Sequence, residues 1–203
     1  MSNGVFKDIL VGSQIEEATI NQLKKWLPTY LREIERQLGL PVGDIPPPHH
    51  YGNRNSFDAI AGEDFPKVIV ISPGLAGPPI AKGDGQYRAV WRLGVGVGVA
   101  AKTEEAGNEM VKIYGAAVRA IMLHKQSLGG LAQAINWEDE SYDDLPIASQ
   151  NQLYKGAALY FAIDCEDVVT KWAGPETPDD ELYAYGRAEH IYIDIEKLPV
   201  RAE

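Results

Sequence analysis

The chain has 203 residues, of which 19 are basic and 29 acidic, so its formal net charge at pH 7 is −10. This length indicates one domain, because domains average about 150 residues, and 45% hydrophobic with 24% charged residues is ordinary for a folded protein. The lone cysteine, Cys165, excludes a disulfide framework and a thiolate-cluster metal site within one chain, and the acidic charge argues against wrapping nucleic acid by neutralising its phosphates.

The sequence shows no visible secretory signal and no stretch long enough for a membrane span. Residues 1–8 lack the basic segment and apolar stretch of a secretory leader. No apolar run approaches the ~18 residues that a membrane span needs. We therefore expect a protein made in a reducing cytoplasm, without a membrane partner.

The first predicted element is a helix from Glu16 to Leu38. Apolar residues recur there at three- and four-residue steps and form one stripe. Pro28 lies inside the pattern and removes one backbone donor, which predicts a kink or two helices in series. Gly39 followed by Pro41 predicts the end of the helix.

The next segment is rich in proline and glycine. Residues 41–65 contain Pro46, Pro47 and Pro48 and are predicted to be irregular. The apolar, β-branched run Lys67–Ile71 predicts a short strand. Ser72–Gly85, with three prolines and four glycines, is expected to be a loop or the tip of a long hairpin.

Arg88–Ala100 is the clearest strand, because its residues alternate strictly between two faces. One face carries Ala89, Trp91, Leu93, Val95, Val97 and Val99, and the other carries Arg88, Val90, Arg92, Gly94, Gly96 and Gly98. The glycines strip the second face of side chains, so another group can approach its backbone closely.

A second helix is predicted after Thr103, which can cap it, and it should end before Gly129. Ala134–Trp137 is then expected to be a short strand and Glu138–Leu145 an acidic loop. Alternating apolar residues predict another strand over Gly156–Cys165.

The C-terminal part begins with a polar linker over Ala173–Asp180. The alternation of Ile191, Ile193 and Ile195 with polar residues suggests a last strand within a C-terminal extension, 176–203. Grouped strands around one central helix predict a single α+β domain over residues 1–203. We expect a mostly antiparallel sheet of about four strands, with helices on one face.

Motifs that carry chemistry are absent or incomplete. Gly96–Ala101 fits G-x-G-x-x-A, but its glycines lie within the strand alternation and no acid stands about 20 residues on. G-x-S-x-G and H-E-x-x-H do not occur, and a calcium loop starting at Asp139 fails at its sixth and twelfth positions. We predict no catalytic residue, metal or cofactor, although paired-carboxylate catalysis stays open because nothing selects a pair.

Several residues are suited to assembly instead. Trp137, Tyr142 and Trp172 either anchor an interface or cover the core. Arg88 and Arg92 either pair with acids of a neighbouring subunit or face solvent. Glu138 and Asp139 belong to an acid-rich segment that is either a solvated loop or a charged interface.

The stretch 114–175 resembles the phage tail terminator family, whose members cap the tail tube of long-tailed phages. The resemblance rests on the order and spacing of its motifs: Tyr114–Ala120, Ser127–Gly130, Trp137–Pro146, the strand Gly156–Asp164, and Gly174 with Pro175. It implies a homo-oligomeric ring, a hexamer, that docks on the tail tube protein, stops polymerisation and offers a surface to the head–tail connector.

The resemblance also implies a virion protein of the tail neck that is no enzyme and needs no cofactor. DNA would pass through the ring lumen without specific binding, and an acidic wall would repel its phosphates. Two alternatives stay open. One is a head–tail stopper or adaptor, and the other is a small soluble enzyme or ligand-binding protein using the loops 46–56 and 138–144.

Overall fold

The computed structural model describes residues 12–53, 65–82, 87–147 and 152–166. The fold is α+β, as predicted, with two α-helices and a mixed sheet of six strands rather than about four antiparallel ones. The elements in chain order are α1 (Gly12–Leu38), β1 (His50–Gly52), β2 (Lys67–Leu75), β3 (Ile80–Ala81), β4 (Tyr87–Ala101), α2 (Glu104–His124), the 3-10 turn η2 (Leu128–Gly130), β5 (Ala134–Asp144) and β6 (Leu153–Cys165). Trp172, the linker at 173–180 and the strand expected around residues 191–195 lie outside the described residues.

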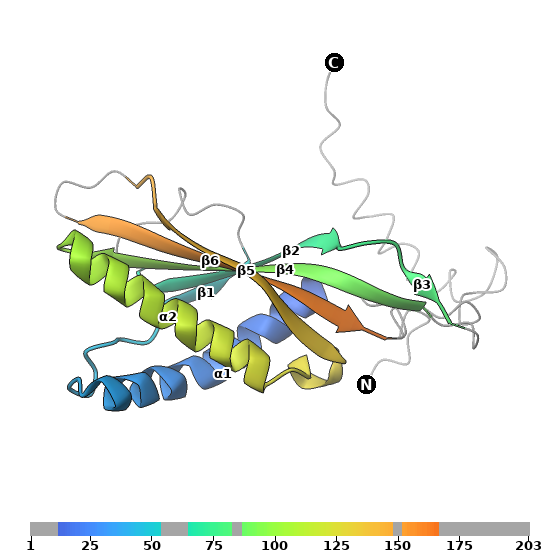
Figure 1. The fold of residues 1–203 in the computed structure, drawn as a ribbon, viewed down its shortest axis with the longest axis horizontal. Helices are drawn as coiled ribbons and strands as arrows, with labels where there is room; N and C mark the ends of the chain where they lie inside the picture. Colours follow the sequence, from blue (N-terminus) through green and yellow to red (C-terminus); the bar gives the residue numbers. More distant parts are fainter. Residues whose placement is uncertain (1–11, 54–64, 83–86, 148–151, 167–203) are drawn as a thin grey trace, which may run out of the picture.

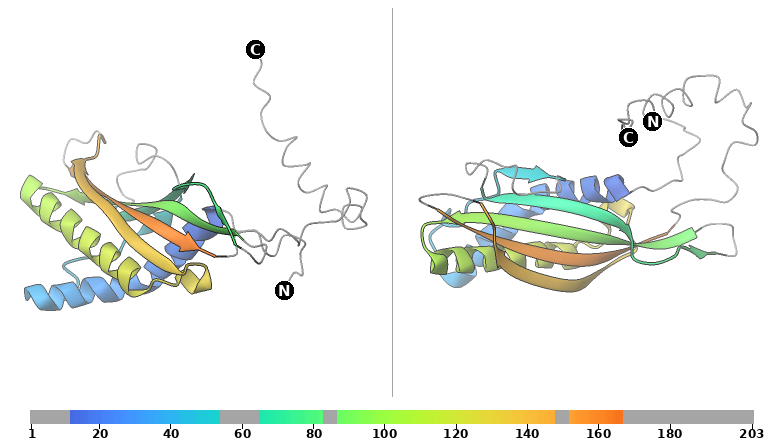
Figure 2. Two further views of the ribbon diagram at one scale, coloured as in Figure 1. Left: turned by 45° about the vertical axis from the view of Figure 1, so that its right-hand side comes forward. Right: turned by 90° about the horizontal axis from the view of Figure 1, so that it is seen from above.

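The sheet has the order β1-β2-β4-β6-β5, and β3 pairs with the first residues of β4. β1 runs parallel to β2, whereas all other neighbours are antiparallel. Both helices lie on one face of this sheet (Figures 1 and 2), as predicted. The two additional strands, β1 and β3, have only three and two residues, too few to show a periodic pattern in the sequence.

Helix α1 continues through Pro28, so the expectation of two helices in series is wrong. Leu23, Leu27 and Leu31, on both sides of the proline, are fully buried. Burying a leucine contributes roughly 1.5–3 kcal/mol, so the three together outweigh the cost of about 3 kcal/mol for a proline inside a helix. Tertiary packing thus decides the length of this helix.

The end of α1 follows the predicted signal. Gly39 has a left-handed backbone with φ 68°, and the N–H of Leu40 donates to the carbonyl of Glu35 at 2.9 Å. The N–H of Gly39 donates to the carbonyl of Arg36 at 3.4 Å. This pair of bonds is a Schellman motif, which satisfies two of the last helical carbonyls.

Helix α2 also begins where the sequence places it. The hydroxyl of Thr103 accepts a hydrogen bond from the N–H of Ala106 at 3.3 Å, and two glutamates occupy the first turn. None of the helices among the described residues has the length and apolar character that crossing a bilayer would require.

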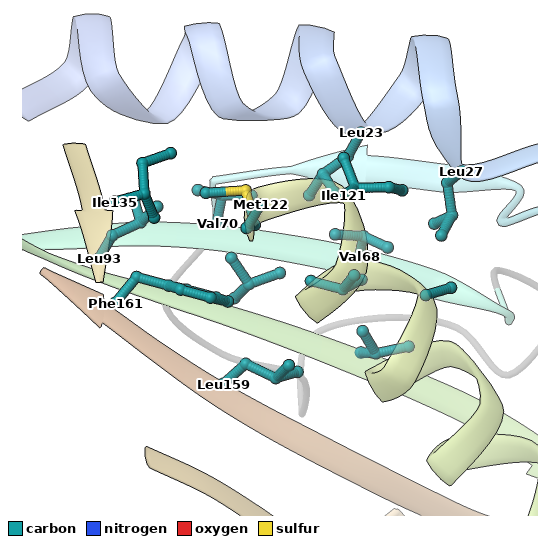
Figure 3. Close-up of a cluster of buried hydrophobic side chains, with 14 of the residues drawn as sticks. Leu23, Leu27, Val68, Val70, Leu93, Ile121, Met122, Ile135, Leu159 and Phe161 are labelled. Carbon is teal, nitrogen blue, oxygen red and sulfur yellow. The ribbon is translucent and has the colours of Figure 1, made fainter. Parts of the chain in front are cut away.

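The core fills the space between the two helices and one face of the sheet. Leu23 and Leu27 of α1 and Ile121 and Met122 of α2 point toward β2, β4 and β6 (Figure 3). The predicted apolar face of β4 supplies Leu93, Val95, Val97 and Val99 to this core. The glycine-bearing face of β4 therefore points away from the helices.

Three expected loop segments are partly strand. β2 runs on to Leu75 and β3 follows at Ile80, so Ser72–Gly85 is not simply a loop. β1 interrupts the segment 41–65, which was expected to be irregular. β5 extends to Asp144 because it pairs with β6 along nearly its whole length, and the predicted acidic loop 138–145 is therefore mostly strand.

Candidate functional site

The middle of β5 contains a bulge at Glu138. Trp137 pairs with Phe161 and Asp139 pairs with Tyr160. Glu138, which lies between them, therefore has no paired residue on β6. A bulge of this kind reverses the alternation of the strand beyond it. Trp137 before the bulge and Glu140 after it both face the helices, whereas Asp139 lies on the helix-free face.

The helix-facing side of β5 forms a cluster with α2. The Arg119 guanidinium lies 4.8 Å from the ring centre of Trp137, and its NH1 donates to Glu140 Oε2 at 2.6 Å. The Tyr142 hydroxyl donates to the other oxygen of Glu140. Two predicted interface residues, Trp137 and Tyr142, are thereby joined through Arg119 and Glu140, neither of which was among the predicted interface residues.

Partial burial, followed by the hydrogen bond to Glu140, raises the pKa of Tyr142 to about 12. Gly115 of α2 makes room for this arrangement, because a Cβ there would stand 3.0 Å from the Tyr142 hydroxyl. Trp137 nevertheless remains 45% exposed, and its Nε1 donates to the carbonyl of Asp139 at 3.1 Å. The cluster fixes the orientation of an aromatic side chain that still faces solvent.

The helix-free face of the sheet carries a groove of about 580 Å³. Its lining includes Gly94 and Gly96 of β4, with Arg92, Tyr160, Glu138 and Asp139 around them. Tyr160 is 46% exposed. The glycine pattern did predict a face open to close approach, but nothing in the alternation of β6 distinguished Tyr160 as part of it.

The two predicted arginines have different surroundings. Arg88 forms an ion pair with Asp164 of the neighbouring strand β6, with Nε donating to Oδ1 at 2.8 Å. Arg92 lines the groove, and its backbone carbonyl accepts from the Ser72 hydroxyl at 2.9 Å. Arg88 thus has an acidic partner inside its own chain, whereas Arg92 stands at the groove.

The metal and thiol sites considered in the sequence can be examined among the described residues. Within the described ranges, no group of three or more His, Cys, Asp or Glu side chains could hold a metal ion. Cys165 is buried, and burial raises the pKa of its thiol to about 11. Asp139, Ser141 and Asp143 occupy an extended strand instead of a loop that could wrap a cation.

No protein-family model matches this chain, and a sequence search finds no match among curated proteins. The molecule is defined by its own geometry: an α+β protein with helices on one sheet face, a groove on the other, and an acidic, aromatic strand at one edge.

Proposed function

We propose that this chain is a phage tail terminator, a structural virion protein that acts through contacts between subunits. Copies of the chain form a ring, a hexamer, on the end of the tail tube, stop its polymerisation and provide the joint to the head–tail connector. The ring belongs to the neck end of the tail in the virion.

The observation that carries this proposal is the composition of the β5 edge. β5 is the last strand in the sheet order, and among the described residues it pairs only with β6. An open strand edge offers backbone donors and acceptors to another chain. Trp137 and Tyr142 stand on it at 45% and 38% exposure, and exposed aromatic side chains are frequent anchors of interfaces.

The described residues of the stretch that resembles terminators form one packed unit, which supports the proposal. Helix α2 contacts β4, β5 and β6, and η2 connects it to β5 through Gly129 and Gly130, both with positive φ. The matching motifs within the described ranges are thus neighbours in space as well as in sequence. Helix α2 lies beside β5 in Figure 1.

The acidic character of the chain fits a channel for DNA. A negatively charged ring wall repels phosphates and lets DNA pass without binding. Glu105 and Glu109 of α2 are exposed carboxylates on the described surface. This part of the proposal fails if a map of the assembled ring places all its excess acidic residues on the outer surface.

The decisive experiment deletes the gene from the phage that encodes it and examines the tails by electron microscopy. Tubes of uncontrolled length support a terminator. Tails of normal length that do not join heads would instead indicate a stopper or adaptor, and normal virions would refute both.

Complementation then tests the β5 edge. A Trp137→Ala gene should fail to restore normal tail length, whereas Leu153→Ala should restore it. Leu153 is the matched control, because it has the same 45% exposure but lies on β6. Restoration by Trp137→Ala would show that this aromatic side chain is not needed for assembly.

A ligand-binding protein is the second candidate, and the groove on the helix-free face favours it. Clefts of several hundred Å³ with a few polar groups are typical of small-molecule sites. A screen for ligands that raise the melting temperature tests this function. A hit should lose its effect in Gly94→Leu, which would place a branched side chain on the groove floor beside Tyr160.

A further inference from the structure

A second groove lies between α1 and the turn that follows α2. Its volume is about 740 Å³, and its polar lining includes Asn21, Gln22, Lys25, Trp26, His124 and Lys125. None of the residues that line it carries a carboxylate. On a chain of net charge −10, this groove is a local concentration of positive charge.

The lysines of this groove converge on one indole. Lys125 Nζ lies 4.3 Å from the ring centre of Trp26, and Lys25 Nζ lies 5.5 Å from it. Neither lysine takes part in an ion pair within the part of the chain that the structure describes. The groove therefore offers two ammonium groups and an aromatic surface to an acidic partner.

The chain itself carries a surface of the opposite character at the β5 bulge. Glu138 and Asp139 are exposed there, next to the half-exposed Trp137. Both acids line the groove on the helix-free face, whereas the groove beside Trp26 lies in the helix layer, which covers the other face of the sheet (Figure 2). No ion pair joins the two surfaces within the described chain, so a second copy is a suitable partner.

We propose that the groove formed by Lys25, Trp26 and Lys125 in one copy receives Glu138 and Asp139 of the next copy. This inference rests on the proposed ring function and names the contact between its subunits. Because each copy uses two different surfaces, the contact is heterologous, and repetition generates a closed ring when the rotation between copies fits. The charges set the register, and the two tryptophans provide apolar surface to bury.

Charge reversal in purified full-length protein tests the contact by sedimentation. Lys25→Glu with Lys125→Glu should weaken self-association at least about tenfold, and Glu138→Lys with Asp139→Lys should do the same. All four substitutions in one chain should restore association, because the complementary charges exchange places. Weak association of the four-fold variant, or unchanged association of either double variant, would overturn the proposal.

Matched controls separate this contact from net charge and from folding. Lys24→Glu with Lys112→Glu makes the same charge change at exposed lysines outside the groove, and Glu17→Lys with Glu109→Lys does so for exposed acids. Both controls should associate like the unmodified chain. Melting temperatures of all variants establish that each one is folded.

Two further outcomes are decisive. If the unmodified chain stays monomeric at every concentration, the inference fails, while tail length in the gene deletion still reports the proposed function independently. If reversal of the two lysines abolishes binding to a DNA duplex but leaves sedimentation unchanged, the groove binds phosphates and the subunit contact is refuted.

Discussion

Arg88 and Asp164 form an ion pair across β4 and β6, the two longest strands of the sheet. Arg88 Nε donates to Asp164 Oδ1 at 2.8 Å, and a second guanidinium nitrogen donates to Oδ2. The Asp164 side chain is only 10% exposed, whereas that of Arg88 is 47% exposed. The hydrogen bonds from Arg88 outweigh burial and hold the pKa of the Asp164 carboxyl below its ordinary value of 3.8.

Asp164→Asn should therefore lower the free energy of unfolding at pH 7 by about 1–2 kcal/mol, because it removes a charge-assisted hydrogen-bonded pair. The depressed pKa means that the unfolded chain binds the proton more readily. The stabilisation is present above pH 4 and is lost as the pH falls through the native pKa. Urea unfolding at pH 7 and at pH 3 measures both effects, and the difference between the variant and the unmodified chain should be smaller at pH 3. An equal difference at both values would contradict this assignment.

Two glycines should respond in opposite directions to alanine. Gly39→Ala should destabilise by about 1 kcal/mol, because its φ of 68° is unfavourable for a residue with a Cβ. Gly94→Ala should be neutral or stabilise by up to about 0.5 kcal/mol, because glycine costs entropy in a strand. A Cβ at Gly94 would meet Tyr160 and a backbone oxygen at ordinary contact distances of 3.7 and 3.8 Å. Thermal unfolding of the two variants side by side measures the difference, and equal losses would refute the argument.

The elements that could be predicted from the sequence are those in which a periodic pattern of apolar residues continues over many neighbouring residues. β4 alternates over its whole length and α2 has both a cap and a terminating glycine pair, so their positions follow from periodicity and end signals. β5 could not be predicted in full, since Glu138, Asp139 and Asp143 give its second half the composition of a loop. Its strand conformation depends on pairing with β6. No local pattern in the sequence of β5 reveals that pairing.

The candidate site shows the same division. Trp137, Tyr142, Glu138 and Asp139 could be selected because aromatic and acidic residues stand together in one segment. Their partner Arg119 lies on α2, and the bulge that turns Glu140 toward it depends on the register between β5 and β6. Neither long-range relationship is visible in a single sequence.

Glu35 organises a segment that looked irregular in the sequence. This carboxylate is 1% exposed at the end of α1, and its Oε1 accepts hydrogen bonds from the N–H groups of Gly43 at 3.0 Å and Ile45 at 2.7 Å. Glu35→Ala leaves both donors without this acceptor and should cost about 2–3 kcal/mol. Glu35→Gln keeps one oxygen in place and should cost about 1 kcal/mol.

Chemical denaturation of the two Glu35 variants gives these values, and hydrogen exchange of the Ile45 amide gives an independent local readout. Exchange should accelerate strongly in Glu35→Ala and only slightly in Glu35→Gln. Identical behaviour of the two variants would mean that the negative charge matters more than the hydrogen bonds.

The Cys165 thiol should be nearly inert in the native protein. It is fully buried at the end of β6, and its pKa of about 11 compares with about 8.5 for a free cysteine. Because the thiolate is the reactive form, reaction with a disulfide reagent at pH 8 should be at least about 100-fold slower in the native than in the denatured chain.

Cys165→Ala combined with Lys112→Cys provides the matched control, since it moves the single thiol to an exposed position on α2. This variant should react rapidly while still folded. Rapid reaction of native Cys165 would instead reveal an accessible, activated thiol. A buried neutral thiol cannot act as a nucleophile, whereas an accessible thiolate can. Rapid reaction would therefore favour an enzyme over the assembly protein proposed above.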